Sequence, residues 1–362
     1  MKALRFHAPR DLRLEMVPRP GKPAGNEVKV RVEAAGICGT DLHVFETGAY
    51  VTKAPVVMGH EFAGLVLEAG DGVKGLKPGD RVVGDSRSTC GVCDFCRRGH
   101  PNLCERLGFI GEVRDGAFAE EILIEEPSLL RIDPSVPAGA AALAEPLAVA
   151  VHAAGLAGAG ALSRRTPDPG RGSDPPRSKR AAGGLDAKEA APSSSRRTLV
   201  LGAGPVGALL YEILLLKGLP DIQVSDRSPY RRGVIESVHP GSTDEPSGRY
   251  DIVFETTGAP GVAEDLLPRV VQKRGTLVMV GLYRGPVPFD LNALIESEWN
   301  VLGCAAFSDE LVEAVDILET RWPVFSHVTS HFFPLLGYRE AFDLLLSPQK
   351  NAMKILFQPG LE

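Results

Sequence analysis

A candidate strand, a glycine-rich turn and a candidate helix follow one another in TLVLGAGPVGALLYEILLL, residues 198–216. The turn carries the pattern G-x-G-x-x-G. Here the first glycine allows a tight turn, the second lets the backbone approach a pyrophosphate, and the third permits close packing of helix on strand. The N-terminus of the helix then favours the phosphate charge. The pattern therefore predicts a dinucleotide cradle formed by Gly202, Gly204, Pro205, Val206 and Gly207.

Four further buried-strand candidates continue this α/β pattern: DIQVSD, YDIVFE, GTLVMVG and WNVLGC. Asp226 ends the first of them, twenty-four residues after Gly202. A carboxylate there accepts hydrogen bonds from the adenine ribose and repels a 2′-phosphate, which predicts NAD rather than NADP. Arg227 is expected to belong to this cofactor site. The alternatives are that Arg227, Arg231 and Arg232 bind a 2′-phosphate, or that Asp226 only caps a turn.

The stretch that follows Asp226 is short. Only twenty-four residues separate Asp226 from Asp251, whereas a single βαβ unit takes about thirty residues. In the strand order 3-2-1-4-5-6 of a doubly wound Rossmann sheet, strand 3 lies at an edge. We therefore expect a tolerated deletion in which strand 3 is lost and the order 2-1-4-5-6 stays intact, with a thinner wall around the adenine.

Four of the six cysteines lie within CGVCDFCRRGHPNLC, residues 90–104. Their spacing, C-x2-C-x2-C-x7-C on a tight loop, suits tetrahedral zinc. The alternatives are two disulfides, an iron–sulfur cluster or unpaired surface thiols, but the spacing differs from the common ferredoxin patterns, and thiols in a reducing compartment more often bind metal. Four protein ligands leave no open position. We therefore expect a structural zinc held by Cys90, Cys93, Cys96 and Cys104.

Charge and hydropathy exclude other classes. The net charge of −6 argues against a nucleic-acid-binding protein. MKALRFHAPRD lacks the apolar core of a signal peptide, and apolar runs such as ALLYEILLLKGL are short and contain Glu212 and Lys217. We therefore expect a cytoplasmic protein that binds no membrane.

Residues 163–197 hold nine Lys or Arg, four Asp or Glu and a single large aliphatic residue, Leu185. This composition predicts a flexible surface insertion, with a basic docking segment as the alternative.

The N-terminal third has the pattern of short strands, in EVKVRVEAAGIC, EFAGLVLEAG and DRVVGD, separated by Gly and Pro. It predicts a compact β-barrel-like domain. The Ala-rich stretch ALAEPLAVAVHAAGLAG predicts a helix after it. In the last sixty residues, PLLGYREAFDLLL predicts a helix and AMKILFQP a strand, and we expect both to return to the first domain.

Four residues outside the cysteine loop also have metal-ligating side chains: Cys38 in GICGTDLH, His60 and Glu61 in MGHEFAG, and Glu145 in ALAEPLAV. Thiolate, imidazole and carboxylate can fill a zinc shell and leave a position open for water or substrate. His60 and Glu61 would point to opposite faces of a regular strand, so Gly59 must allow an irregular backbone. The alternatives are that Cys38 is a small core residue and that Glu145 is an acid at a helix start.

The order of these motifs resembles that of the zinc-dependent medium-chain dehydrogenase/reductases. GICGTDLH, GHEFAG, GLKPGDRV, the cysteine loop, EPLAVAVHA and VLGAGPVG follow one another as in that family. The resemblance covers nearly the whole chain outside the insertion and the shortened stretch. It implies a chain of α/β and β class. By this resemblance a GroES-like β-barrel catalytic domain, residues 1–154 and 306–362, is split around a Rossmann domain, residues 198–305. Residues 155–197 are expected, from their composition, to form a flexible low-complexity insertion.

The same resemblance implies a catalytic zinc bound by Cys38 and His60, with Glu61 and Glu145 contributing directly or through water. Where Glu145 stands, the simple alcohol dehydrogenases of this family carry a cysteine. In this respect the chain is similar to the polyol, sugar and threonine dehydrogenase branches.

The resemblance also implies that Thr40 lies near the substrate hydroxyl and that His43 belongs to a proton relay. The alternatives are that Thr40 is an ordinary turn residue and that His43 is a solvated surface side chain.

The predicted activity is hydride transfer between a secondary alcohol (polyol, sugar or similar) and NAD, with NADP less favoured. One catalytic and one structural zinc per chain are expected, in a homodimer or homotetramer. The rival hypotheses are a non-catalytic zinc or nucleotide-sensing protein of the same fold and a threonine-type dehydrogenase. Cys38 with His60 disfavours a zinc-independent quinone reductase.

Overall fold

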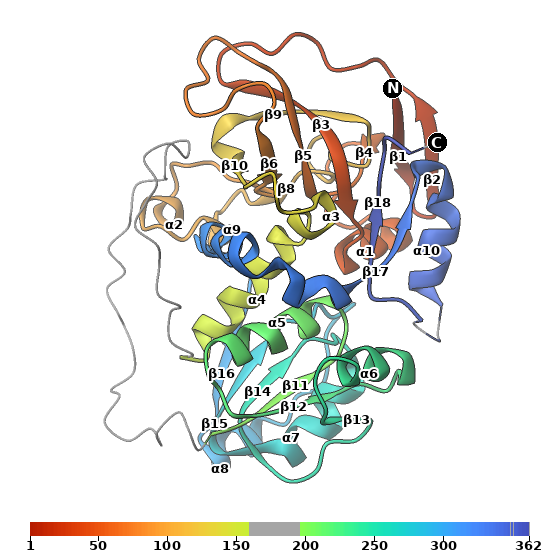
Figure 1. Cartoon of the computed structure of the whole chain (residues 1–362). Helices are drawn as coiled ribbons and strands as arrows, with labels where there is room; N and C mark the ends of the chain where they lie inside the picture. The colour runs from red at the N-terminus through yellow and green to blue at the C-terminus, as the bar shows by residue number, and fades with distance from the viewer. Residues whose placement is uncertain (159–195, 348, 350, 362) are drawn as a thin grey trace. The chain divides into compact units, whose positions relative to one another are not determined.

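The computed structural model describes residues 1–158, 196–347, 349 and 351–361 (Figure 1). Most of the predicted insertion, from 159 to 195, lies outside the described residues. The chain divides into two compact units. The first comprises residues 1–146 together with those from 311 onwards, and the second comprises the described residues between 147 and 310.

The first unit is built from antiparallel β-structure, as its alternating sequences predict. A three-stranded sheet has the order β2-β1-β4, and a larger sheet has the order β10-β6-β5-β3-β18-β17, with β9 also paired to β3. A short pair, β7 with β8, precedes and follows the cysteine loop. The strands are β1 (Lys2–Ala8), β2 (Asp11–Met16), β3 (Glu27–Gly36), β4 (Val56–Val57), β5 (Glu61–Ala69), β6 (Arg81–Gly84), β7 (Arg87–Ser88), β8 (Gly108–Phe109), β9 (Glu121–Glu125), β10 (Leu129–Arg131), β17 (Thr329–Phe333) and β18 (Lys354–Phe357).

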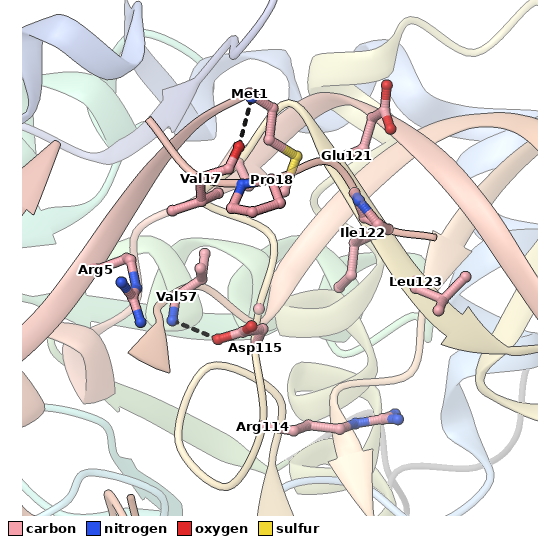
Figure 2. Close-up of a pocket in the computed structure, with 13 residues that line it drawn as sticks. Met1, Arg5, Val17, Pro18, Val57, Arg114, Asp115, Glu121, Ile122 and Leu123 are labelled. Atoms are coloured by element: carbon pink, nitrogen blue, oxygen red, sulfur yellow. Dashed lines mark hydrogen bonds between the residues drawn. The ribbon is translucent and has the colours of Figure 1, made fainter. Parts of the chain in front are cut away.

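A cavity of about 400 Å³ lies in this unit (Figure 2). Its lining comes from β1, the chain after β2, the turn at 114–116 and β9, and includes Met1, Arg5, Asp115 and Ile122. None of the metal-binding or cofactor residues predicted from the sequence lines it. The chemistry predicted above is therefore located elsewhere.

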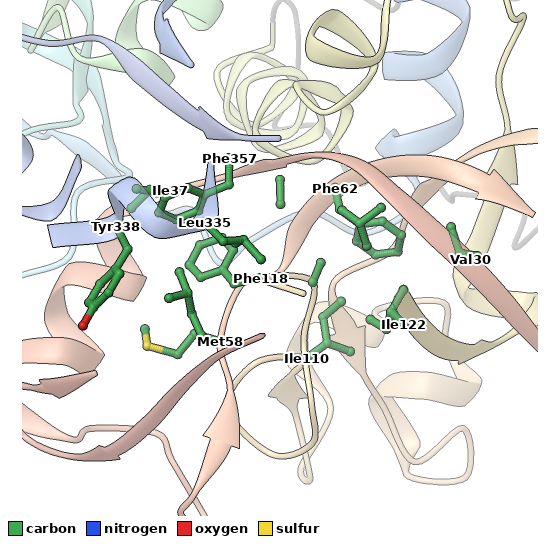
Figure 3. Packing of buried hydrophobic residues seen from close by; sticks show 14 of the residues in the cluster. Val30, Ile37, Met58, Phe62, Ile110, Phe118, Ile122, Leu335, Tyr338 and Phe357 are labelled. Carbon is green, nitrogen blue, oxygen red and sulfur yellow. The ribbon is translucent and has the colours of Figure 1, made fainter. Parts of the chain in front are cut away.

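The core of the first unit joins distant parts of the chain (Figure 3). Val28, Val30 and Val32 alternate along β3 and are buried, as expected for a strand with one face on a core. Phe118 and Phe357 lie edge to face with their ring centroids 5.0 Å apart. The C-terminal segment therefore completes the barrel, since it supplies both β18 and core side chains.

Helices lie between these strands along the described chain. They include α1 (Gly39–Thr47), α2 (Asp94–Arg97), α3 (Ala138–Ala141), α4 (Ala144–Leu156), α9 (Glu310–Arg321) and α10 (Tyr338–Leu346). Most of α4 belongs to the second unit. In the described part of the chain, one helical stretch, Ala138–Leu156, has the length and hydropathy needed to cross a membrane, but 72% of it is buried within the structure. Its apolar character is thus explained by burial within the protein.

The second unit is a six-stranded parallel sheet in the order β13-β12-β11-β14-β15-β16. Its strands are β11 (Arg197–Leu201), β12 (Asp221–Ser225), β13 (Ser242–Thr243), β14 (Tyr250–Glu255), β15 (Val271–Met279) and β16 (Asn300–Gly303), with helices α5 (Pro205–Leu216), α6 (Pro229–Glu236), α7 (Leu267–Val270) and α8 (Leu291–Ser297). The order corresponds to 3-2-1-4-5-6, the doubly wound arrangement. The predicted Rossmann topology is confirmed.

The expected loss of strand 3 is wrong. The strand survives as β13, two residues long, and pairs in parallel with Val224 and Ser225 of β12. The sequence lacks a return helix, since residues 244–249 run from β13 to β14 without one. The seven Cα–Cα steps from Thr243 to Tyr250 can reach about 24 Å when extended. The link must cross three strand spacings, about 14 Å, and return about 16 Å along the sheet, which is a distance of about 22 Å. A direct link therefore suffices when the edge strand is this short.

Candidate functional site

The pairing of β3 with β5 brings two of the predicted ligands together. Gly36 at the end of β3 lies opposite Glu61 at the start of β5. Cys38 follows Gly36 by two residues and His60 precedes Glu61, so both lie at the same end of the strand pair. One ligand atom from each of Cys38, His60 and Glu61 lies within 4.8 Å of the other two.

Two glycines make this convergence possible. Gly59 has φ +93°, a left-handed conformation that other residues rarely adopt. It turns the backbone just before His60, so the adjacent His60 and Glu61 can both contribute to one cluster. At Gly36, a Cβ would stand 2.1 Å from Glu61 Oε2. Any larger residue at position 36 would displace that carboxylate.

Asp41 is a site residue that the sequence analysis missed. It is buried in the first turn of α1 and accepts a hydrogen bond from Cys38 N at 2.8 Å through Oδ2. Its Oδ1 lies 3.7 Å from His60 Nδ1. Burial alone would lower the pKa of His60, but Asp41 and Cys38 together hold it well above its ordinary value. The capping position of Asp41, three residues after Cys38, was the sequence signal available.

Lys354 of β18 was also missed. Its Nζ donates to Glu61 Oε1 at 2.8 Å and Oε2 at 2.7 Å, and to Ile37 O at 3.1 Å. The two side chains are 3% and 1% exposed. Burial alone would lower the pKa of Lys354, but its attraction to Glu61 leaves that pKa above its ordinary value. A separation of 293 residues hides this pair from local sequence reasoning.

Glu145 lies in the first turn of α4 and does not belong to the three-residue cluster. It is buried, and its Oε1 accepts a hydrogen bond from the fully buried Ser86 at 2.7 Å. Burial raises its pKa to about 7, and the charge of Glu61 adds to that increase. His60 acts on Glu145 in the opposite direction, so the two side chains are close enough to interact electrostatically.

The acids of this region lack balancing positive charge. Burial raises the pKa of Asp41, and it raises that of Glu112 to about 7, as it does for Glu145. Lys354 already bonds to Glu61. A divalent cation would relieve this imbalance, and a thiolate, an imidazole and carboxylates are suitable donors for zinc. The residues present therefore fit a zinc ion.

Thr40 and His43 lie on α1, three residues apart, and so on neighbouring positions of one helix face. Thr40 Oγ1 lies 3.7 Å from Cys38 Sγ, which places the hydroxyl beside the metal-type cluster. The His43 ring lies 5.7 Å from the Tyr50 ring. Among the described residues no hydrogen bond joins Thr40 to His43, so the relay between them stays a prediction.

The four cysteines of the 90–104 loop form the second cluster. One sulfur from each of Cys90, Cys93, Cys96 and Cys104 lies within 4.8 Å of the others, and all four are free of disulfides. Backbone N–H groups of Val92 and Cys93 lower the pKa of Cys90 to about 6. Burial and the neighbouring sulfurs raise that of Cys96 to about 12. Four converging sulfurs, all free of disulfides, fit a closed metal site.

The glycine-rich turn has the geometry that its sequence predicts. Gly202 has φ +103°, and a Cβ on Gly207 would stand 1.8 Å from Gly202 O. Pro205 and Val206 open helix α5. The packing of β11 against α5 therefore requires glycine at both positions. The N–H groups that a phosphate could contact are those of the first turn of α5, which have no acceptor within the helix.

Asp226 lies directly beside this turn. Its Oδ2 accepts from Ala203 N and its Oδ1 from Ser228 N, both at 2.8 Å. Arg227 is exposed. Arg231 lies close to the turn, since its Nη1 lies 3.3 Å from where a Cβ on Gly204 would stand. The cofactor region therefore presents a carboxylate and a guanidinium together.

A metal-type cluster in a β-barrel unit and a dinucleotide turn in a parallel sheet define a nicotinamide-dependent dehydrogenase class. Residues 24–134 match the family model described as the alcohol dehydrogenase GroES-like domain. An L-threonine 3-dehydrogenase from Pyrococcus horikoshii is 31% identical over 296 residues, covering 77% of this chain and 74% of that protein. The chain belongs to the zinc-dependent medium-chain dehydrogenase/reductase family, and it is an oxidoreductase.

Two further similarities cover nearly the whole chain. D-arabinitol dehydrogenase 1 from Uromyces fabae is 28% identical and covers 99% of this chain and 97% of its own length. The crystal structure of a proposed zinc-binding dehydrogenase from Sinorhizobium meliloti 1021, bound to NADP, matches with a TM-score of 0.83 at 26% identity and 99% coverage of both chains. The predicted family and the predicted fold class are thereby confirmed.

Proposed function

We propose that this enzyme oxidises secondary alcohols of the polyol or sugar class with NAD. The observation that carries the proposal is the cluster of Cys38, His60 and Glu61 with the buried Glu145 beside it. Glu145 can accept a hydrogen bond from a hydroxyl next to the one that reacts, which a cysteine at that position does less well. Similarity over nearly the full length to a D-arabinitol dehydrogenase supports the same substrate class.

Each side chain has a role in this proposal. Cys38, His60 and Glu61 hold zinc, with Glu145 contributing through water or the substrate. When bound, zinc supplies the Lewis acidity that favours loss of the alcohol proton, and NAD accepts the hydride. Thr40 accepts that proton through its hydroxyl and passes it towards His43 and solvent. Asp41 and Lys354 hold His60 and Glu61 in place.

The four cysteines of the 90–104 loop hold a second, structural zinc, and Asp226 sets the preference for NAD. Reduced thiols are needed at both clusters, which supports a cytoplasmic location.

A homodimer or homotetramer is also proposed. Its support is the edge strand β16 with Val301 exposed, and the exposed Leu291 and Ile295 of α8; light scattering after size-exclusion chromatography tests it.

The experiment is a screen of the purified zinc-loaded enzyme against polyols, aldoses and ketoses, monitored by NADH absorbance. Cys38→Ser should abolish oxidation, while binding of NAD, measured by calorimetry, stays near the wild-type level because the dinucleotide turn is in the other unit. Cys304→Ser, which changes a thiol outside both clusters, is the matched control. Full activity of Cys38→Ser, or activity that survives removal of all zinc, contradicts the proposal.

A threonine-type dehydrogenase is the second candidate, favoured by the 31% identity to an L-threonine 3-dehydrogenase. Adding L-threonine to the same screen separates the two. Higher kcat/KM for L-threonine than for every polyol would assign the second activity.

A further inference from the structure

Glu112 differs from the other acids near Cys38 and His60 because no group among the described residues binds its carboxylate. Asp41 accepts from Cys38 N, Glu61 binds Lys354, and Glu145 accepts from Ser86. Glu112 is only 5% exposed. Within the described residues, its side chain has neither a hydrogen-bond donor nor an ion-pair partner.

The backbone around Glu112 packs against the metal-type cluster. The N–H groups of Glu112 and Val113 both donate to Phe109 O, at 3.1 Å each, and form a tight turn. A Cβ on Gly111 would stand 2.7 Å from Gly59 N, so the turn lies against the residue that precedes His60. The ring of Phe109 lies 6.2 Å from the ring of His60. These distances place the turn that carries Glu112 next to the residues around His60.

The charge of Glu112 is coupled to the same residues. His60 and Asp41 are the two charged groups that act on its pKa, besides the burial that raises it to about 7. Its oxygens are not among the fully sealed, unpartnered atoms of the described structure, so a small donor can reach them. A buried carboxylate without a donor destabilises the protein until a ligand or a proton supplies one.

We propose that Glu112 binds a substrate hydroxyl other than the one that is oxidised, and that it thereby selects polyols over monohydric alcohols. The inference rests on the proposed function, since it assigns a further contact to that substrate. A hydroxyl suits this position because it donates to the ionised carboxylate and accepts from the protonated acid, whereas an ammonium group binds only the ionised form. Glu112 is thus a specificity residue of the site.

The test uses three four-carbon substrates that differ in hydroxyl number: 2-butanol, 2,3-butanediol and threitol. Glu112→Leu should lower kcat/KM for threitol about 10–100-fold, the loss of a hydrogen bond to a charged group. The value for 2-butanol should change less than about twofold. Glu112→Gln should retain most activity on threitol because its amide oxygen still accepts from a hydroxyl. Glu68→Gln, on β5 and paired with Lys29, is the matched charge control.

Three results overturn the inference: equal losses on 2-butanol and threitol, no loss on threitol, or loss on threitol as large for Glu112→Gln as for Glu112→Leu. The last would indicate a requirement for negative charge. Zinc content and thermal unfolding of each variant identify any general damage. Calorimetric binding of threitol with NADH present keeps the two proposals separate. If the wild type does not oxidise threitol, the proposed activity is refuted. If threitol nevertheless binds more weakly to Glu112→Leu than to the wild type, the contact with Glu112 is supported.

Discussion

Replacing Lys354 by Met should destabilise the protein strongly, because it leaves the carboxylate of Glu61 buried without its cation. The two side chains are 3% and 1% exposed and make two contacts of 2.7 and 2.8 Å. At an effective dielectric constant of about 20, their attraction is about 6 kcal/mol, which offsets the cost of burying both charges. Breaking one partner of such a pair typically costs 3–5 kcal/mol. We therefore expect Lys354→Met to lower the free energy of unfolding by about 4 kcal/mol.

Urea unfolding, followed by far-UV circular dichroism on chelator-treated protein, measures this change. The double variant Lys354→Met/Glu61→Gln should be more stable than Lys354→Met, because the neutral amide at position 61 leaves no uncompensated carboxylate there. Zinc-loaded protein should lose less on Lys354→Met, since zinc compensates Glu61. Lys29→Met is the matched control. Its partner Glu68 is 49% exposed, so its loss should cost under about 1 kcal/mol. The reasoning is refuted if Lys354→Met costs no more than Lys29→Met, or if the two substitutions at 354 and 61 are additive.

Two further predictions concern the second metal cluster and the cofactor. Cys96→Ser should release about one zinc per chain and lower the melting temperature, because metal-binding energy is folding energy at a closed site; unchanged zinc content by atomic absorption would contradict a structural zinc there. Asp226→Ser should raise kcat/KM with NADP relative to NAD, because it removes the charge that repels a 2′-phosphate while a hydroxyl can still accept from Ala203 N. A wild-type enzyme that already prefers NADP would show that Arg231 determines the choice.

The parts of the fold encoded by local patterns were predictable. The glycine-rich turn, α5 and the parallel strands follow from residues 198–303, since glycine spacing and runs of buried apolar residues act over short distances. The strands β3, β5 and β6 likewise follow from alternation. The edge strand β13 was not predictable, because two residues, Ser242 and Thr243, carry no hydrophobic pattern. They form a strand only because β12 offers an open edge.

The functional site also has parts that the sequence could predict and parts that it could not. Cys38, His60 and Glu61 could be named as candidates from residue type, and the four cysteines of the 90–104 loop from their spacing. The sequence could not show that Glu61 binds Lys354, that Ser86 binds Glu145, or that the Glu112 carboxylate lacks a partner among the residues that the structure describes. These facts depend on which strands pair and in which register, as in the pairing of Gly36 with Glu61.

By itself, then, the sequence determined which residues can ligate zinc and where a dinucleotide binds, because those properties belong to side-chain chemistry and to short motifs. The tertiary structure decided which of the buried carboxylates have a partner among the described residues and which do not. Burial and long-range pairing control the protonation and the partners of Asp41, Glu61, Glu112 and Glu145. The burial and the partners of these side chains cannot be read from the sequence, because they depend on strands such as β3, β5 and β18 lying side by side. The free energy of a buried charge depends on neighbours that are distant in the chain.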